Sequence, residues 1–160
     1  MRLPHQRTVL KALHYGVLPL FIWFTLVQPQ DVRPIGDWAF QMHSVFGLIF
    51  VSFALFWTAF FLRKGLIGRP GPKLPPWAKR VHRLLHITLI WGLFLVAFTG
   101  FLLGLTSSVL LWAGGIVPIA PPMGWPEWNH LVGIVHSVEF YTLGVVVAAH
   151  AGFHIWRHLW

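Results

Sequence analysis

The stretch HSVEFYTLGVVVAAH carries a histidine at each end, His136 and His150, around an otherwise mostly apolar sequence. An ionisable side chain is costly inside a bilayer, so a helix that carries two of them is expected to use them. On one helix these residues would be roughly 21 Å apart along the axis and would project within roughly 40° of the same face. Neither ring could reach the other, so each requires a partner on a different helix.

The composition predicts that these histidines belong to a membrane protein. Of the 160 residues, 56% are hydrophobic and only 10% are charged, and the mean hydropathy is +0.67. A soluble domain could not cover its surface with so few charges. The absence of cysteine excludes disulfides, zinc–thiolate sites, iron–sulfur clusters and thioether-linked haem. The net charge of +8 is assigned to membrane topology, and no nucleic acid is expected as a partner.

Four apolar stretches approach the length of about 20 residues that crosses the hydrocarbon core of a bilayer. The predicted spans are residues 10–27, 39–62, 86–106 and 131–154. The first span follows a basic segment, as a signal peptide would, but no small-residue cleavage site follows the apolar stretch at residues 27–30. It is therefore expected to be a retained helix and not a signal peptide. The connections are too short for a second domain. We therefore predict one all-α integral membrane domain over residues 1–160, a bundle of four transmembrane helices.

The distribution of charge predicts the orientation of this bundle. Eleven of the twelve lysines and arginines lie near the N-terminus, between the second and third spans, or near the C-terminus. The acids (Asp31, Asp37, Glu127 and Glu139) lie on or near the other side, with Arg33. By the positive-inside rule, both termini and the middle loop are expected in the cytoplasm.

The expected depths of the histidines predict how they pair. His14 lies about one turn into the first span and reaches a depth similar to that of His150, near the cytoplasmic face. His43 lies about one turn into the second span, at a depth comparable with that of His136, near the outer face. Two separate imidazole pairs in an apolar bundle fit two b-type haems, because each haem iron takes two axial nitrogens. Polar contact between helices is the alternative role for such histidines.

Other residues near the cytoplasmic face leave alternatives open. His82, Arg83 and His86 form part of a cationic group that could contact haem propionates or a quinone headgroup, or could simply set the topology. His86 or His154 could also replace one of the four ligands. Glu139, one turn past His136, could hydrogen-bond a ligand or carry protons, or could be an interfacial acid.

Several motifs resemble those of the bacterial cytochrome b561 family, which is related to the membrane subunits of formate dehydrogenases and nickel–iron hydrogenases. They are ALHYGVLPL, QMHSVFGL, KLPPWAKRVHRLLHITLIWGLFLVAFTGFLLG, and two histidines fourteen apart followed by HIWRH. The resemblance covers nearly the whole chain. It implies a four-helix protein of the bacterial inner membrane with two haem b groups, ligated by His14, His43, His136 and His150. His86 resembles a histidine of the family that is not usually a ligand.

Electron transfer across the membrane is the function that these features predict, between a quinone such as ubiquinone and a redox partner at the surface. The chain could act alone or as the cytochrome subunit of a larger dehydrogenase complex. Superoxide:ubiquinone oxidoreduction, an activity of some family members, is an alternative, although an outer side with Arg33 among acids would attract an anion poorly. A non-haem proton or metal-ion relay is the alternative from another class. The apolar residues between the two histidine depths disfavour it.

Overall fold

The computed structural model describes residues 6–28, 31, 33–66, 74–113 and 117–159. Four long helices dominate these residues: α1 (Gln6–Leu26), α3 (Asp37–Lys64), α4 (Pro76–Thr106) and α5 (Pro126–Leu159), with a short 3-10 helix η1 (Arg33–Ile35) before α3. Each of the four is long and apolar enough to cross a membrane. The helical fold and its four membrane-length helices therefore agree with the prediction from sequence.

The helices are longer than the apolar segments that predicted them. With 31 residues in α4 and 34 in α5, their lengths are about 46 and 51 Å, whereas a hydrocarbon core is about 30 Å thick. The extra turns contain the polar and charged residues at the ends of each helix. Proline at the first position of α4 is favourable there, because the N–H that proline lacks would have no partner within the helix.

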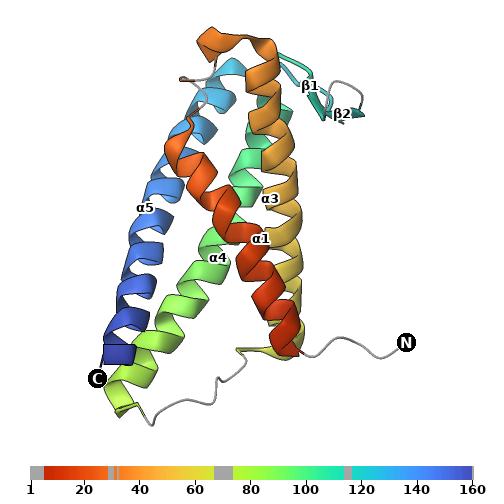
Figure 1. The fold of residues 1–160 in the computed structure, drawn as a ribbon. Helices are drawn as coiled ribbons and strands as arrows, with labels where there is room; N and C mark the ends of the chain where they lie inside the picture. The colour runs from red at the N-terminus through yellow and green to blue at the C-terminus, as the bar shows by residue number, and fades with distance from the viewer. Residues whose placement is uncertain (1–5, 29–30, 32, 67–73, 114–116, 160) are drawn as a thin grey trace.

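The ends of the bundle differ in charge. α1 begins and α5 ends at the same end, where α3 also ends and α4 begins (Figure 1). Basic residues gather there: Arg63 and Lys64 lie in the last turn of α3, and Lys79, Arg80 and Arg83 lie in the first turns of α4. Glu127 lies at the opposite end, in the first turn of α5. We call these the termini side and the hairpin side of the bundle.

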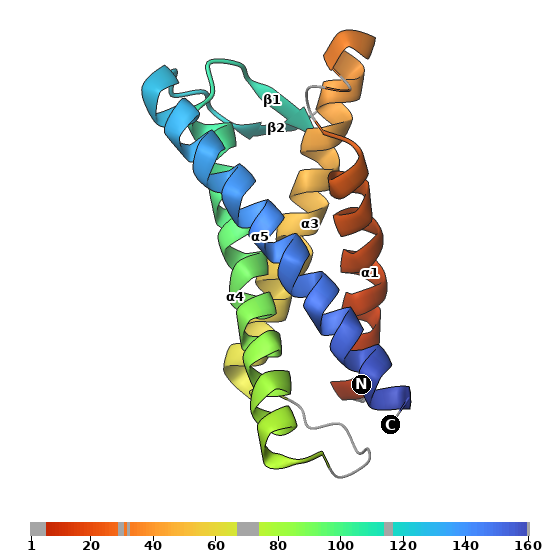
Figure 2. The same ribbon diagram turned by 90° about the vertical axis from the view of Figure 1, so that its left-hand side faces the viewer.

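The four long helices form one bundle (Figure 2). An apolar core joins all four of them. Its buried members are Val17, Phe21 and Phe24 from α1, Phe50 and Ala54 from α3, Leu93, Val96 and Ala97 from α4, and Phe140 and Leu143 from α5. The ring centroids of Phe21 and Phe140 are 5.2 Å apart, so α1 and α5 meet here. Along α1, α4 and α5 the core lies between His14, His86 and His150 toward one end and Thr99 and His136 toward the other.

The outer faces of the helices carry large apolar side chains that are not covered by the rest of the chain. Phe56 is 55% exposed, Val138 60% and Val145 71%. Apolar surface of this extent is rare on a water-soluble monomer and is the normal surface of a helix in lipid. The four helices therefore indicate a multi-pass membrane protein.

A two-stranded antiparallel sheet lies between α4 and α5, an element that the sequence analysis did not predict. β1 (Leu111–Ala113) pairs with β2 (Val117–Ala120), with an irregularity between Leu111 and Trp112. The backbone N–H of Trp112 donates to Gln41 Oε1 on α3 at 3.0 Å. The hairpin thus attaches to the first turns of α3. Its strands have three and four residues, and the second contains Pro118, so they are too short to give a clear alternating pattern.

The segment that returns from the hairpin to α5 caps the end of α4. Backbone N–H groups of Met123, Gly124 and Trp125 donate to the carbonyls of Leu105, Ser107 and Thr106. Gly124 has a φ of +66°, which favours glycine in this turn. Asn129 Nδ2 donates to the Leu103 carbonyl and to Thr106 Oγ1, both at 2.9 Å. These bonds satisfy carbonyls that have no partner within the helix.

Replacing Asn129 should therefore destabilise the bundle. We expect Asn129→Ala to lower the free energy of unfolding by about 1–2 kcal/mol, because two acceptors lose their donor. Ser137→Ala is the matched control, since the Ser137 hydroxyl donates only to the Gly133 carbonyl of its own helix on an exposed face. Unfolding in detergent micelles, followed by circular dichroism, would measure both variants. Equal midpoints would contradict the role given to Asn129.

Candidate functional site

Histidines gather at two separate places in the bundle. On the hairpin side, His43 of α3 and His136 of α5 lie within electrostatic range of each other. On the termini side, His82 and His86 of α4 lie beside His150 and His154 of α5. His14 of α1 lies within electrostatic range of His86 and His150. We call the two groups the hairpin-side site and the termini-side site.

His43 occupies a half-buried position in the hairpin-side site. Phe24 packs edge-on against its ring, with the centroids 4.9 Å apart. Its Nδ1 atom is buried and has no hydrogen-bond partner among the described residues. One turn further along α3, a Cβ atom on Gly47 would meet nothing within 4 Å. A buried polar atom without a partner is unusual in a native protein, so it suggests that another group binds near it.

A hydrogen-bonded chain orients His136 in the same site. Thr99 Oγ1 of α4 lies 2.9 Å from His136 Nδ1 and 2.8 Å from Glu139 Oε2. The hydroxyl has one proton, and its bond to the carboxylate is charge-assisted and shorter than its 3.0 Å contact with the Leu95 carbonyl. When this proton goes to Glu139, Thr99 Oγ1 accepts from His136 Nδ1–H. His136 Nε2 is then the ring nitrogen left to act as a ligand.

Gly100 allows the His136 ring to lie close to α4. A Cβ atom at this position would stand 3.2 Å from His136 Cε1, and Nδ1 would be 3.7 Å away. A side chain here would push the ring away from Thr99. The sequence analysis gave no role to Thr99 or Gly100. The residues themselves gave a weak signal, a threonine–glycine pair in an apolar stretch, which helix packing also explains.

Two rings of the termini-side site are oriented by backbone carbonyls. His14 Nδ1 lies 2.8 Å from the Leu10 carbonyl, and His86 Nδ1 lies 2.7 Å from the His82 carbonyl. A carbonyl oxygen only accepts, so both rings donate through Nδ1 and present Nε2 as the free nitrogen. His14 is exposed, and its ring centroid lies 4.7 Å from that of Trp57, another residue to which the sequence analysis gave no role.

His150 has two ring contacts with other histidines. Its centroid is 4.6 Å from that of His86 and 4.7 Å from that of His154. Its Nδ1 atom, like that of His43, is buried without a hydrogen-bond partner among the described residues. The structure therefore places His86 in ring contact with His150, and His14 only within electrostatic range of it. Arg83 is exposed on α4, beside this site in the sequence.

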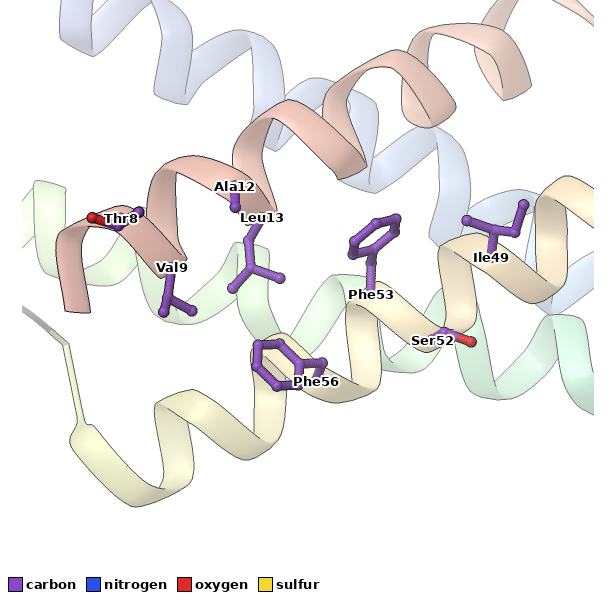
Figure 3. A pocket seen from close by; sticks show the side chains of 8 residues that line it. All are labelled: Thr8, Val9, Ala12, Leu13, Ile49, Ser52, Phe53 and Phe56. Atoms are coloured by element: carbon purple, nitrogen blue, oxygen red, sulfur yellow. The ribbon is translucent and has the colours of Figure 1, made fainter. Parts of the chain in front are cut away.

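A groove of about 520 Å³ lies elsewhere, between α1 and α3 (Figure 3). Its lining residues are Thr8, Val9, Ala12 and Leu13 of α1 and Ile49, Ser52, Phe53 and Phe56 of α3. Figure 3 shows these side chains around the space between the two helices. The lining contains no histidine and no charged residue, so the groove offers an apolar surface and no group for chemistry.

Comparisons with protein-family models, curated proteins and solved structures found no match. The chemistry of the two sites is therefore argued from the chain's own residues. They define a helical protein with four membrane-length helices and two histidine sites at opposite ends of an apolar core.

The contact of Thr99 with His136 can be tested directly. We expect Thr99→Val, which keeps the shape of the side chain but removes the hydroxyl, to leave His136 Nδ1 without this partner. Nitrogen NMR of the labelled imidazole should then show a changed environment of Nδ1, with the Val96 carbonyl as the remaining backbone partner of the ring.

Thr88→Val is the control, because Thr88 lies on an exposed face of the same helix. An unchanged His136 spectrum in Thr99→Val would show that the hydroxyl does not set the tautomer.

Proposed function

We propose that the chain is a dihaem b-type membrane cytochrome that transfers electrons across the bilayer between a quinone and a redox partner at the membrane surface. The observation that carries this proposal is the arrangement of its histidines. Two groups lie at opposite ends of the bundle, and an apolar core separates them. Each group contains one buried imidazole nitrogen that has no hydrogen-bond partner among the described residues.

The residues fit axial ligation of haem at both sites. In the hairpin-side site, His136 of α5 presents Nε2. His43 of α3 has a buried Nδ1 atom without a hydrogen-bond partner among the described residues. In the termini-side site, His14 presents Nε2 and His150 has the unpartnered nitrogen. The proposed pairs remain those predicted from the sequence, His43 with His136 and His14 with His150. A bound haem supplies a one-electron redox centre at its iron, whose potential depends on ligands, hydrogen bonds and burial.

The chain's own residues have separate tasks in this proposal. Thr99 and Glu139 hold the tautomer of His136, and Gly100 keeps space for its ring. Phe24 and the other core residues exclude water from the space between the sites. The exposed basic residues Lys79, Arg80 and Arg83 supply positive charge for haem propionates or a quinone headgroup at the termini side.

The apolar core favours electron transfer over a proton or metal-ion relay. A relay requires polar groups at short intervals between the two sites. The buried described residues there are apolar apart from Thr58, whose hydroxyl donates to the Ala54 carbonyl of its own helix. An electron can cross such a region without them. The motifs that resemble the cytochrome b561 family support the same function. We accordingly propose a bacterial inner membrane as its location, and the charge distribution supports an orientation with both termini and the middle loop in the cytoplasm.

Haem content is the first test. We expect about two b haems per chain, as each needs two axial ligands. We expect the hairpin-side haem to be lost in both His43→Ala and His136→Ala. We expect the termini-side haem to be lost in both His14→Ala and His150→Ala. A pyridine-haemochrome assay with protein quantitation measures this, and potentiometric titration identifies the centre that is lost. His130→Ala is the control, because His130 is an exposed histidine at the hairpin side. Folded protein without haem would refute the proposal.

Electron transfer across the bilayer is the second test. The haem-loaded chain would be reconstituted in vesicles that contain ferricyanide, and a reduced ubiquinone analogue would be added outside. We expect ferricyanide inside to be reduced, because the two sites lie toward opposite ends of the bundle. The rate should fall to that of protein-free vesicles when either haem is removed by the variants above. A rate that survives the loss of one haem would contradict transfer through both.

A further inference from the structure

Three histidines near the termini side lie close enough together to bind a metal ion. One ligand atom from each of His82, His86 and His154 lies within 4.8 Å of the other two. All three residues are half-buried. None of them is among the four residues assigned above to haem. Their arrangement therefore has to be explained separately.

The fold determines this arrangement through two helices. His82 and His86 are four residues apart on α4, so they share one face, and their ring centroids are 4.1 Å apart. His154 of α5 faces them, with centroids 5.9 Å from His82 and 6.4 Å from His86. Trp77 of α4 packs on Trp156 of α5 at 5.3 Å close by. Packing of two rigid helices, and not a loop, thus positions the three rings.

One of the three rings also has its ligand atom defined. His86 Nδ1–H donates to the His82 carbonyl at 2.7 Å, so Nε2 of His86 is the nitrogen available to a metal. Metal-binding histidines commonly make such a bond through their second nitrogen, which fixes the tautomer and the ring orientation.

The chemistry of the ligands selects the class of ion. Imidazole suits zinc, copper and nickel, whereas magnesium and calcium prefer oxygen ligands. Glu127 and Glu139 belong to the hairpin half of α5, so neither supplies a carboxylate here. Zinc–nitrogen bonds of about 2.0–2.1 Å in a tetrahedron imply nitrogens about 3.4 Å apart. Small side-chain rotations would bring the three nitrogens from their present spacing, within 4.8 Å of one another, to this shorter distance.

We propose that His82, His86 and His154 bind one divalent transition-metal ion of the zinc class, with a fourth coordination position left for water or a small anion. Arg157 lies within electrostatic range of His82, and Lys79, Arg80 and Arg83 are exposed nearby. Their positive charge weakens the binding of a cation and favours an anion as the fourth ligand. None of the three histidines is an assigned haem ligand, but His86 and His154 are in ring contact with His150. Haem and zinc are therefore assayed separately, so that the failure of either proposal can be recognised.

The probe is zinc, added to the haem-loaded chain in detergent after purification through a tag without histidine and treatment with a chelator. We expect one zinc per chain after desalting, by mass spectrometry of the metal. His82→Ala and His154→Ala should each weaken binding by at least about tenfold, the smallest loss expected even for an outer partner of a metal site. His130→Ala, at the hairpin side, should bind as the unchanged chain does. Haem is assayed in every sample.

A second measurement on the unchanged chain does not depend on the folding of a variant. Cobalt in place of zinc should give the visible absorption bands of a tetrahedral ion. Copper should give nitrogen couplings from three imidazoles in its electron paramagnetic resonance spectrum. Zinc bound equally by His82→Ala, His154→Ala and the unchanged chain would overturn the proposal. So would zinc that is lost in His150→Ala or that displaces haem, because the ion would then occupy the haem ligands.

Discussion

The packing of α4 against α5 is the interaction on which both histidine sites depend. Near the hairpin side it brings Thr99 of α4 to His136 and Glu139 of α5. Near the termini side the same pair of helices brings His86 into ring contact with His150. The Asn129 side chain joins the end of one helix to the start of the other. A rotation of α5 about its axis would therefore disturb both sites together.

Glycine makes this close packing feasible at two levels of α4. A Cβ atom on Gly92 would stand 2.8 Å from Leu143 Cδ1, and one on Gly100 would stand 3.2 Å from His136 Cε1. In lipid, the hydrophobic effect contributes little to helix association, so van der Waals packing and hydrogen bonds must supply more of the association free energy. The same glycines thus serve packing and, at Gly100, the position of a histidine. This explains why small residues alone could not reveal the site.

The length of the apolar stretches predicted the four helices because a bilayer imposes a simple rule: a long apolar stretch must satisfy its backbone as a helix. It also separated the histidines into two levels, which follows from counting residues along straight helices. It did not predict the hairpin, whose short strands depend on a contact with Gln41 seventy-one residues away. It could not predict that His86 contacts His150, because the rotation of each helix about its axis is set by packing.

Depth distinguishes the histidines of the termini side from one another. In a hydrocarbon core of about 30 Å centred on α4 and α5, roughly 8–10 Å of each helix would extend beyond the core at either end. His86 and His150 would then lie inside the core, whereas His154 would lie beyond its edge and His82 at its boundary. The His150 Nδ1 atom is buried without a hydrogen-bond partner among the described residues, which is costly and supports the proposed haem there. At His82 and His154, water can reach the rings, so a hydrated ion could arrive and exchange there.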